Sequence, residues 1–400
     1  MIAPLLLLFF AVICASVVTY GTHPNWAEFG WGLDWIMLTR RLQWPLVAAS
    51  VFCCVVLLGL IISGKRRAWW MIGLAPVVAL FYHRFVSISD NAMGIVENPP
   101  FVTVDRATFM REDDMVLGLM FRDEPFALPF AALYAQPVVF CTEREHKLVV
   151  FWSAFANRAL AFSVSRELKP RDLEIVSVPA NGLLLFNRKH GQFIAGMTGV
   201  RPGDGARPVG LEQQIRTNKH TWHDWRALHP TTRVMVPRGP LDLLPPRAVE
   251  PYFKLPAQSV SSTDTRRVTV VGAGEVLAVD PARLPVEPVN VTVHQTRVLL
   301  LLDPATRTLR AFNRQIKGDL FPTFKPHKIA RDNTVVMKDG DSDSLWSADG
   351  RCVSGELKGE RLTPLPVDED VPLAVLRYWY PELVVWGERD ATEMTVSKSP

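Results

Sequence analysis

The densest cluster of titratable side chains in the sequence is HTWHDWRALH, at residues 220–229. His220 and His223 are three residues apart, so on a helix they would share one face and could bind a metal ion with a third ligand. The alternative is a structural helix that buries an apolar stripe, with His229 as a half-buried ring with a polar tip. Apolar residues at the matching positions of a second, similar segment favour the structural alternative.

Three aspartates alternate in KDGDSDSLW, at residues 338–346: Asp339, Asp341 and Asp343. This spacing resembles the start of a calcium loop. An EF-hand also needs glycine at its sixth position and a bidentate glutamate at its twelfth, and Ser344 and Gly350 stand there instead. We therefore predict a solvated β-turn, with a chance calcium contact as the alternative.

The stretch RVTVVGAGEVLAVD, at residues 267–280, has the outline of a dinucleotide-binding turn, with Gly272 and Gly274 after a β-branched run. A pyrophosphate site needs glycines for close approach of the backbone and a helix N-terminus to meet the charge. Leu277 stands where a third glycine is expected, and Pro281 follows too soon for a helix to develop. The pattern favours the corner of a β-hairpin and no nucleotide cofactor.

The five cysteines are Cys14, Cys53, Cys54, Cys141 and Cys352, and the first three lie in long apolar runs. We predict that the other two pack as small buried residues. A disulfide between them, outside the cytoplasm, is the alternative. Neither has a histidine at a suggestive spacing, and no Gly-x-Ser-x-Gly motif occurs. The sequence therefore predicts no catalytic, cofactor-binding or metal-binding residue.

Long apolar runs at residues 1–20, 42–63 and 68–82 must be assigned before any fold is considered. A helix rises about 1.5 Å per residue and needs roughly 20 residues to cross a bilayer. The first two runs are long enough, and the third is short but flanked by aromatic and basic residues that could anchor it at the bilayer surface. We predict a membrane anchor of about three helices over residues 1–86. A cleaved signal peptide is the alternative for the first run.

The basic link at residues 65–67 predicts the orientation of the anchor, because lysine and arginine in short links stay in the cytoplasm. Residues 87–400 then lie outside the cytoplasm, although Arg40 and Arg41 favour the opposite orientation. We expect a bacterial inner-membrane protein whose soluble part is periplasmic or extracellular.

Beyond residue 87 the sequence consists of short β-branched runs broken by proline, glycine and aspartate, which is typical of antiparallel β structure. Strands are expected at residues 116–121, 146–152, 158–164, 182–187, 267–271, 296–302 and 307–312, and helices at 220–228 and 372–380. The fold class predicted is α+β, mainly antiparallel, with short helices.

Matching features recur at a nearly constant offset. The pair at residues 161–162 recurs at 311–312, an offset of 150, and His229-Pro230 recurs as Tyr380-Pro381, an offset of 151. We predict a tandem duplication of one β-rich unit: a first copy at 87–236, a proline-rich linker at 237–258, a second copy at 259–390 and a tail at 391–400.

The offset provides the internal comparison for the histidine cluster. Trp222, Trp225 and His229 correspond to Leu373, Leu376 and Tyr380. Apolar residues replacing tryptophan at helical spacing indicate a stripe that faces the core. Arg226 and Arg377 also correspond, either as exposed or capping arginines or as paired anion contacts in a groove between the copies.

Three segments carry a family resemblance. Residues 343–366 (DSLWSADGRCVSGELKGERLTPLP), 220–236 (HTWHDWRALHPTTRVMV) and 126–139 (FALPFAALYAQPVV) resemble motifs of the bacterial domain-of-unknown-function family 3179. Members usually carry a Cys-Pro-Leu-Cys segment, which here is replaced by residues 153–156 and 303–306, and a Trp-His-Glu segment, replaced by 135–137. Any centre built from those cysteines and that histidine cannot form at these positions.

These features predict a membrane-anchored binding or assembly module rather than an enzyme. Its partners are expected to be the bilayer and an unidentified protein or small molecule, bound in a groove between the copies. Net charge is only +4 and is scattered along the chain, which argues against nucleic acid. The alternative is a divergent hydrolase or redox enzyme with its site in the same groove. A transporter accessory ranks last because the predicted spans hold essentially no polar residues.

Overall fold

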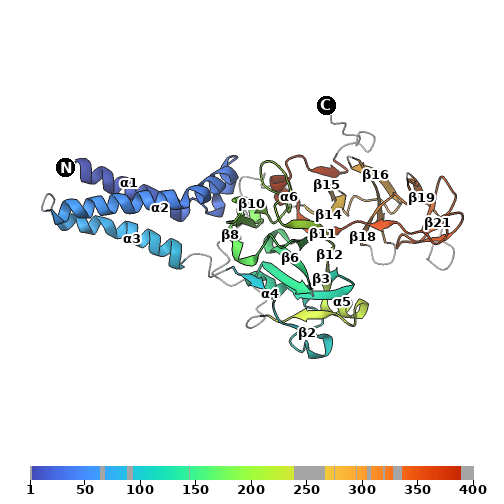
Figure 1. Ribbon diagram of the computed structural model, residues 1–400. Helices are drawn as coiled ribbons and strands as arrows, with labels where there is room; N and C mark the ends of the chain where they lie inside the picture. The colour runs from blue at the N-terminus through green and yellow to red at the C-terminus, as the bar shows by residue number, and fades with distance from the viewer. Residues whose placement is uncertain are drawn as a thin grey trace.

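A computed structural model shows a helical bundle joined to a β-rich body (Figure 1). It describes residues 2–63, 68–87, 93–143, 145–237, 266–273, 275–293, 295–303, 308–318, 320–327 and 336–388. The predicted linker beyond residue 237, the predicted tail and Gly274 lie outside the described residues.

The bundle is built from α1 (Ile2–Tyr20), α2 (Gly32–Ile62) and α3 (Ala75–Tyr82). Shorter helical turns accompany them: η1 (Pro24–Glu28), η2 (Ala68–Leu74) and η3 (His83–Ser87). Two helices, Ala3–Tyr20 and Gly32–Ile62, are long and apolar enough to cross a membrane, and a third apolar helix, Trp70–Phe85, is shorter.

The second apolar helix begins ten residues earlier than the run predicted at 42–63, because α2 starts at Gly32 and contains Arg40, Arg41 and Pro45. The uncharged run in the sequence begins only after Arg40 and Arg41, so its length underestimates the helix. The structure tolerates them because this part of α2 packs against the β-rich body rather than continuing the apolar bundle.

In the first half of the body, the residues that the structure describes form three sheets. The outer sheet is ordered β12 (Thr217–Thr221), β3 (Met115–Phe121), β4 (Glu124–Pro129), β13 (Arg233–Met235), β2 (Phe101–Thr103). The middle sheet is ordered β1 (Ile95–Glu97), β5 (Val138–Glu143), β6 (His146–Ser153), β7 (Arg158–Val164), β11 (Leu211–Ile215). The third is ordered β10 (Gln192–Ala195), β9 (Leu184–Asn187), β8 (Leu173–Ser177).

Short helices connect these strands: α4 (Phe130–Ala135), α5 (Trp222–Leu228), η4 (Val104–Arg106), η5 (Ala154–Ala156), η6 (Pro170–Asp172) and η7 (Pro179–Asn181). One apolar cluster joins the outer and middle sheets, and another joins the middle sheet to the third. The middle sheet is therefore covered on both faces. This explains why its strands appear in the sequence as continuous apolar runs rather than alternating ones.

The described residues of the second half also form three sheets. The first is ordered β24 (Val367–Pro372), β14 (Arg267–Ala273), β15 (Glu275–Val279), β25 (Val384–Trp386). The second is ordered β16 (Val289–Val293), β17 (Thr296–Leu302), β18 (Leu309–Asn313), β23 (Thr363–Pro364). The third is ordered β19 (Phe324–Pro326), β20 (Met337–Asp339), β21 (Leu345–Trp346), β22 (Cys352–Ser354). Helix α6 (Leu373–Trp379) follows β24 as α5 follows β12.

Strand registers in the two halves correspond. The parallel pair β4–β13 sets Phe126 opposite Arg233, and β15–β25 sets Leu277 opposite Val384, 151 residues later in both strands. The antiparallel pairs β6–β7 and β17–β18 correspond at an offset of 150, with residues 150 and 161 matching 300 and 311. Most described strand pairs are antiparallel, and the parallel ones are β1–β5 and β4–β13 in the first half and β15–β25 in the second.

The predicted hairpin at residues 267–280 is confirmed. Strands β14 and β15 pair antiparallel, with Gly272 opposite Val276 and Ala273 opposite Glu275. After β15 the chain enters a turn at residues 281–283 rather than a helix. The described residues on either side of Gly274 therefore form a hairpin, and no helix N-terminus follows β15.

Candidate functional site

The structure places the two predicted metal-binding histidines on different elements. His220 lies on strand β12, and α5 begins only at Trp222, with Thr221 as the N-cap whose hydroxyl accepts a hydrogen bond from the backbone amide of Asp224. The helical spacing assumed for His220 and His223 was therefore wrong. Among the described residues, no group of three His, Cys, Asp or Glu side chains could hold a metal ion.

The histidine rings instead belong to the packing around Trp225. The rings of His220 and His229 lie 5.6 and 4.1 Å from the Trp225 ring, centroid to centroid. Burial lowers the pKa of both histidines. Trp222 and Trp225 are fully buried, as are Leu373 and Leu376 in the second half, which confirms the predicted core-facing stripe.

The two matched arginines bind carboxylates of their own halves. Arg226 Nη2 is 2.5 Å from Glu112 Oε1, and Arg377 Nη2 is 2.7 Å from Glu388 Oε1. His223 Nδ1 is also 3.0 Å from Glu112 Oε2. These pairs support the interpretation as exposed structural arginines over that of anion contacts in a groove between the copies.

The aspartate-rich segment forms a turn, but its first carboxylate is not solvated as predicted. Asp339 is only 1% exposed. Its carboxylate accepts hydrogen bonds from Trp346 Nε1 at 3.0 Å and from the backbone amide of Ser342 at 2.6 Å. Burial alone would raise the pKa of Asp339, but these hydrogen bonds outweigh it and lower the pKa. Asp341 accepts from the amide of Thr323, and Asp343 pairs with Lys338.

Cys141 and Cys352 are both free and buried, as predicted. Burial raises the pKa of the Cys141 thiol to about 12, so the thiol stays protonated and unreactive near neutral pH. Ser153, the first residue of the segment that replaces the family's cysteines, is also buried, and its hydroxyl accepts a hydrogen bond from the amide of Leu183 at 3.2 Å.

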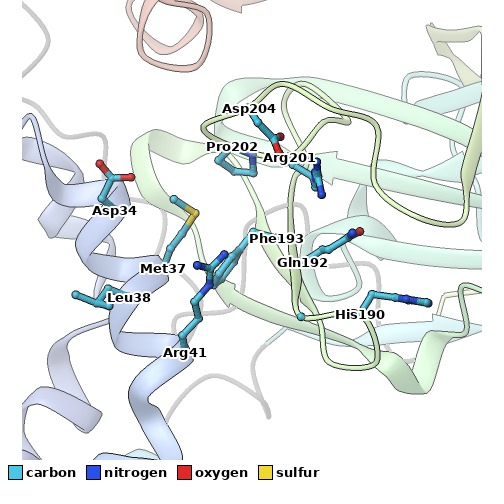
Figure 2. Close-up of a pocket in the computed structure, with 11 residues that line it drawn as sticks. Asp34, Met37, Leu38, Arg41, His190, Gln192, Phe193, Arg201, Pro202 and Asp204 are labelled. Carbon is cyan, nitrogen blue, oxygen red and sulfur yellow. Dashed lines mark ion pairs between the residues drawn. The ribbon is translucent and has the colours of Figure 1, made fainter.

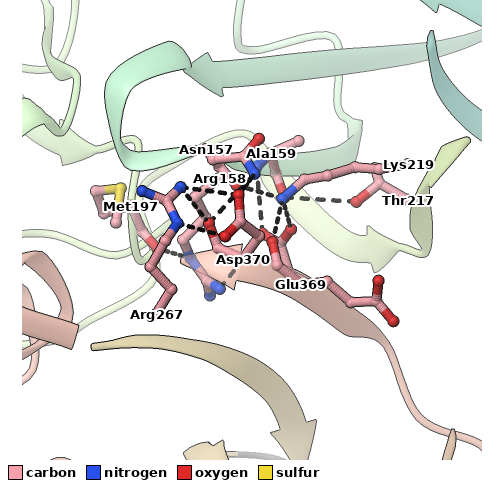
Figure 3. A network of polar contacts seen from close by, with 10 residues as sticks. Asn157, Arg158, Ala159, Met197, Thr217, Lys219, Arg267, Glu369 and Asp370 are labelled. Atoms are coloured by element: carbon pink, nitrogen blue, oxygen red, sulfur yellow. Dashed lines mark hydrogen bonds and ion pairs between the residues drawn. The ribbon is translucent and has the colours of Figure 1, made fainter. Parts of the chain in front are cut away.

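The densest charged cluster lies where the two halves meet (Figure 3). Strand β12 of the first half contacts strand β24 of the second, and β7 contacts β24 beside it. We call the residues that join these strands the inter-half network: Asn157, Arg158, Lys219, Arg267, Asp368, Asp370 and Tyr380.

Lys219 lies at the centre of the inter-half network. Its ammonium is ion-paired with Asp368 and donates to the backbone carbonyls of Asn157 and, at 2.8 Å, Glu369. An ammonium has three N–H donors, and all three are used. Burial lowers the pKa of Lys219, while the carboxylate of Asp368 opposes this shift. The geometry is that of a protonated structural lysine.

Arg158 extends the network to the core of the second half. Its Nε donates to the carbonyl of Met197 at 2.8 Å, and its Nη2 donates to Tyr380 Oη at 3.1 Å. Tyr380 Oη in turn donates to the same Met197 carbonyl at 2.9 Å. Arg158 Nη1 also lies 3.6 Å from Asp368. Beside these contacts, apolar side chains of both halves form one shared core cluster.

The edge of the network is a bulge in β24. Asp370 has a positive φ of 60°, and the pairing of β24 with β14 shifts register between Val268 and Val270. Arg267 binds the Asp370 carboxylate, with Nη2 2.9 Å from Oδ2. A β-bulge re-aims side chains, which here brings this carboxylate to both Arg267 and Asn157.

The sequence did not predict this cluster. Thr217–Thr221 and Val367–Pro372 are polar segments without the β-branched pattern of a strand. The available signal was the offset of 151, which makes Lys219 and Asp370 equivalent positions with opposite charges.

A second polar site lies where α2 meets the third sheet. Arg40 binds Glu174 through two hydrogen bonds, Nε–Oε1 at 2.9 Å and Nη2–Oε2 at 2.5 Å, and both side chains are largely buried. The Arg40 guanidinium also lies 4.7 Å above the Phe186 ring. Ile36 of α2 is fully buried against Leu184 and other apolar residues of β8–β10.

Next to this junction is a cleft of about 420 Å³ (Figure 2). Residues of α2 line one wall, and residues of the β9–β10 hairpin and the following loop line the other. Its charged side chains are Asp34 and Arg41 on α2, and Arg201 and Asp204 on the loop. Like the inter-half network, the cleft brings together charged groups from distant segments of the chain.

The protein is therefore of the α+β class: two N-terminal helices are long and apolar enough to span a membrane, and the body consists of several mostly antiparallel sheets. A family model described as "Protein of unknown function (DUF3179)" matches residues 91–272. This match supports the family resemblance over the first half of the body and the start of β14, while the resemblance noted at residues 343–366 lies outside it. No curated protein and no solved structure matches the chain.

Proposed function

We propose that this protein is a membrane-anchored module that holds a duplicated β-rich body at the extracytoplasmic surface of a bacterial inner membrane, where the body binds a ligand or partner. The observation that carries the proposal is the continuity of α2. One helix contains an apolar segment long enough to span a bilayer and, in the same element, the Arg40 turn that packs onto the body.

The length of α2 supports this division. From Trp44 to Ile62 there are 19 residues, which at about 1.5 Å per residue cover ~28 Å, close to the hydrocarbon thickness of a bilayer. Tyr20, Trp44 and Tyr82 are exposed, and Tyr20 and Trp44 contact His83 and Phe85 of η3. Aromatic rings at one level of three helices are typical of a membrane–water interface.

The duplication is part of the proposal. It is supported by the equal strand orders of the outer sheets, β12-β3-β4-β13 and β24-β14-β15-β25, and by the registers that correspond at offsets of 150 and 151. A chance resemblance would not be expected to preserve a parallel pair, its residue register and the helix that follows β12 or β24.

The orientation follows from the basic link at residues 65–67, which should stay cytoplasmic. The experiment that tests it is labelling of intact spheroplasts with a membrane-impermeant maleimide. We expect Asp113→Cys, on the exposed surface of the body, to react in intact spheroplasts. Ser63→Cys, at the far end of α2, should react only after permeabilisation. The wild-type chain is the control, because its cysteines are buried or half-buried. The reverse labelling pattern would contradict the orientation.

The inter-half network also raises the alternative of an enzyme, because a buried lysine with a lowered pKa is one form of an activated nucleophile. The three acceptors around the Lys219 ammonium favour a structural role instead. Competitive labelling with an amine-reactive ester, followed by mass spectrometry, separates the two. A structural Lys219 reacts far more slowly than the exposed Lys358, whereas a catalytic amine would react faster.

A further inference from the structure

The cleft between α2 and the β9–β10 hairpin lies at the level where the proposed membrane segment ends. Arg41 is three residues before Trp44, so it lies about 4.5 Å further along the helix axis. Gly21, just after α1, packs against Thr39 of α2, which places the end of α1 at the same level. In the proposed arrangement, the Arg41 side chain is therefore at the depth of the lipid headgroups.

Arg41 differs from its neighbour in how its charge is used. The Arg40 guanidinium is buried in a two-point pair with Glu174. Arg41 is exposed, its guanidinium lies 5.5 Å from the Phe193 ring centroid, and it forms no ion pair within the described part of the chain. A guanidinium at this depth with free donors is suited to bind a phosphate group through two hydrogen bonds.

Asp34 is the other charged residue that α2 contributes to the cleft. Asp34 precedes Arg41 by seven residues, two helical turns, so it lies on the same face and about 10 Å further from the bilayer. On the opposite wall, Arg201 Nη2 pairs with Asp204 at 2.5 Å, and Arg201 Nε is buried without a hydrogen-bond partner. The order of the charges on α2, outward from the bilayer, is positive and then negative.

A phospholipid with an amine in its headgroup presents the complementary order, with the phosphate at the bilayer edge and the ammonium beyond it. We propose that this cleft binds the headgroup of an amine-bearing phospholipid, with its phosphate on Arg41 and its ammonium toward Asp34. Leu38 and Met37, which line the cleft on α2 between Arg41 and Asp34, would contact the two headgroup carbons that join the phosphate to the ammonium. This inference rests on the proposed membrane anchoring.

The test uses the full-length chain in detergent, stripped of lipid and titrated with phosphatidylethanolamine or phosphatidylglycerol while native mass spectrometry counts bound lipid. We expect phosphatidylethanolamine to bind the wild type more tightly. Arg41→Gln should weaken both lipids about tenfold, because a charge-assisted hydrogen bond is lost. Asp34→Asn should remove the preference for phosphatidylethanolamine and leave phosphatidylglycerol binding unchanged. Arg166→Gln, an exposed arginine that does not line the cleft, should change neither.

Separate titrations with inorganic phosphate and with free phosphoethanolamine distinguish the source of the ligand. Either one binding as tightly as the lipid would overturn the lipid assignment. Equal binding of phosphatidylethanolamine to the wild type and to Arg41→Gln, with unchanged melting of the variant, would overturn the site. Equal binding of the two lipids by the wild type would overturn the amine assignment. All these results leave the maleimide labelling pattern unaffected, so the inference can fail while the membrane anchoring stands.

Discussion

The two halves of the body use different side chains where helix α5 or α6 packs on the sheet beside it. In the first half, the Trp225 ring covers Gly118, where an added Cβ would lie 2.4 Å from the ring. In the second half, the corresponding residues are Leu376 and Val270, both buried in one cluster. The equivalence follows from the strand pairs, because Gly118 lies opposite Ala127 and Val270 lies opposite Ala278.

The polar partner changes with the ring. Trp225 Nε1 donates to the hydroxyl of the buried Thr232 at 2.9 Å. At the offset of 151, Thr232 corresponds to Leu383, which packs against the same core as Leu376. The first half thus packs the Trp225 ring over a glycine and pairs its N–H with a hydroxyl. The second half has three aliphatic residues at the corresponding positions, Val270, Leu376 and Leu383. The comparison shows that a ring N–H that needs a hydroxyl partner in the first half has an aliphatic counterpart in the second half that needs none.

The largest loss of stability is expected from a substitution in strand β12, through which the first half contacts β24 of the second. Lys219→Met leaves the mostly buried Asp368 with two longer contacts, to Arg158 at 3.6 Å and to the backbone amide of Ala159 at 3.4 Å. Breaking a buried pair by removing one partner costs about 3–5 kcal/mol. We expect a loss of this size in the stability of the full-length chain, measured by urea unfolding in detergent.

The control for this prediction is Asp370→Asn. It weakens the exposed pair with Arg267 at the edge of the same network, and exposed pairs contribute at most about 1 kcal/mol. If both variants lose the same amount of stability, Lys219 is not the centre of the contact between the halves.

The second prediction transfers the packing of one half to the other. Gly118→Val forces the Trp225 ring out of place, and overpacking of this kind costs about 3 kcal/mol. Adding Trp225→Leu and Thr232→Leu should recover most of this loss, because the three residues then match those of the second half. Thermal unfolding of the single and triple variants measures the coupling. A triple variant less stable than Gly118→Val would contradict the proposed equivalence.

The smallest effect is a difference in acid stability between the halves. Burial lowers the pKa of His220 and His229 in the folded chain, so the unfolded chain takes up these protons first. Stability should therefore fall as pH drops below the ordinary histidine value of 6.5. In the second half, the lowered pKa of Asp339 predicts a loss only below the ordinary value of 3.8.

His229→Tyr, which imitates Tyr380, should reduce the loss between pH 7 and 5 without changing stability at pH 8. The measurement is the unfolding temperature as a function of pH. An unchanged pH profile would show that His229 does not contribute to the acid sensitivity.

Elements whose stability comes from local pattern and burial could be predicted from the sequence. Strands β7 and β17 match the expected residues 158–164 and 296–302, because strands covered on both faces leave continuous apolar runs. The short helices were found because their apolar residues repeat at helical spacing. The beginning of α2 was missed because Arg40 is accommodated by Glu174, 134 residues away.

The candidate sites could not be predicted in the same way. Lys219 and Asp368 lie on segments without strand-like sequence, and their pairing depends on how the halves pack. The cleft beside Arg41 is formed by a helix and a hairpin about 150 residues apart in the chain. The sequence contained the charges, but only the tertiary structure shows which of them face each other.

Pro45 lies inside α2, at the end of the proposed membrane-spanning segment that is nearer the body. Proline has no backbone N–H, so the helix lacks the hydrogen bond that would reach back to the carbonyl of Arg41. Helix α2 would therefore bend most easily at Pro45. The two hydrogen bonds between Arg40 and Glu174 hold the part of α2 that precedes Pro45 against the body. If α2 anchors the body as proposed, a bend at Pro45 would tilt the body relative to the spanning segment, about one helical turn from the contact of Arg41 with Phe193.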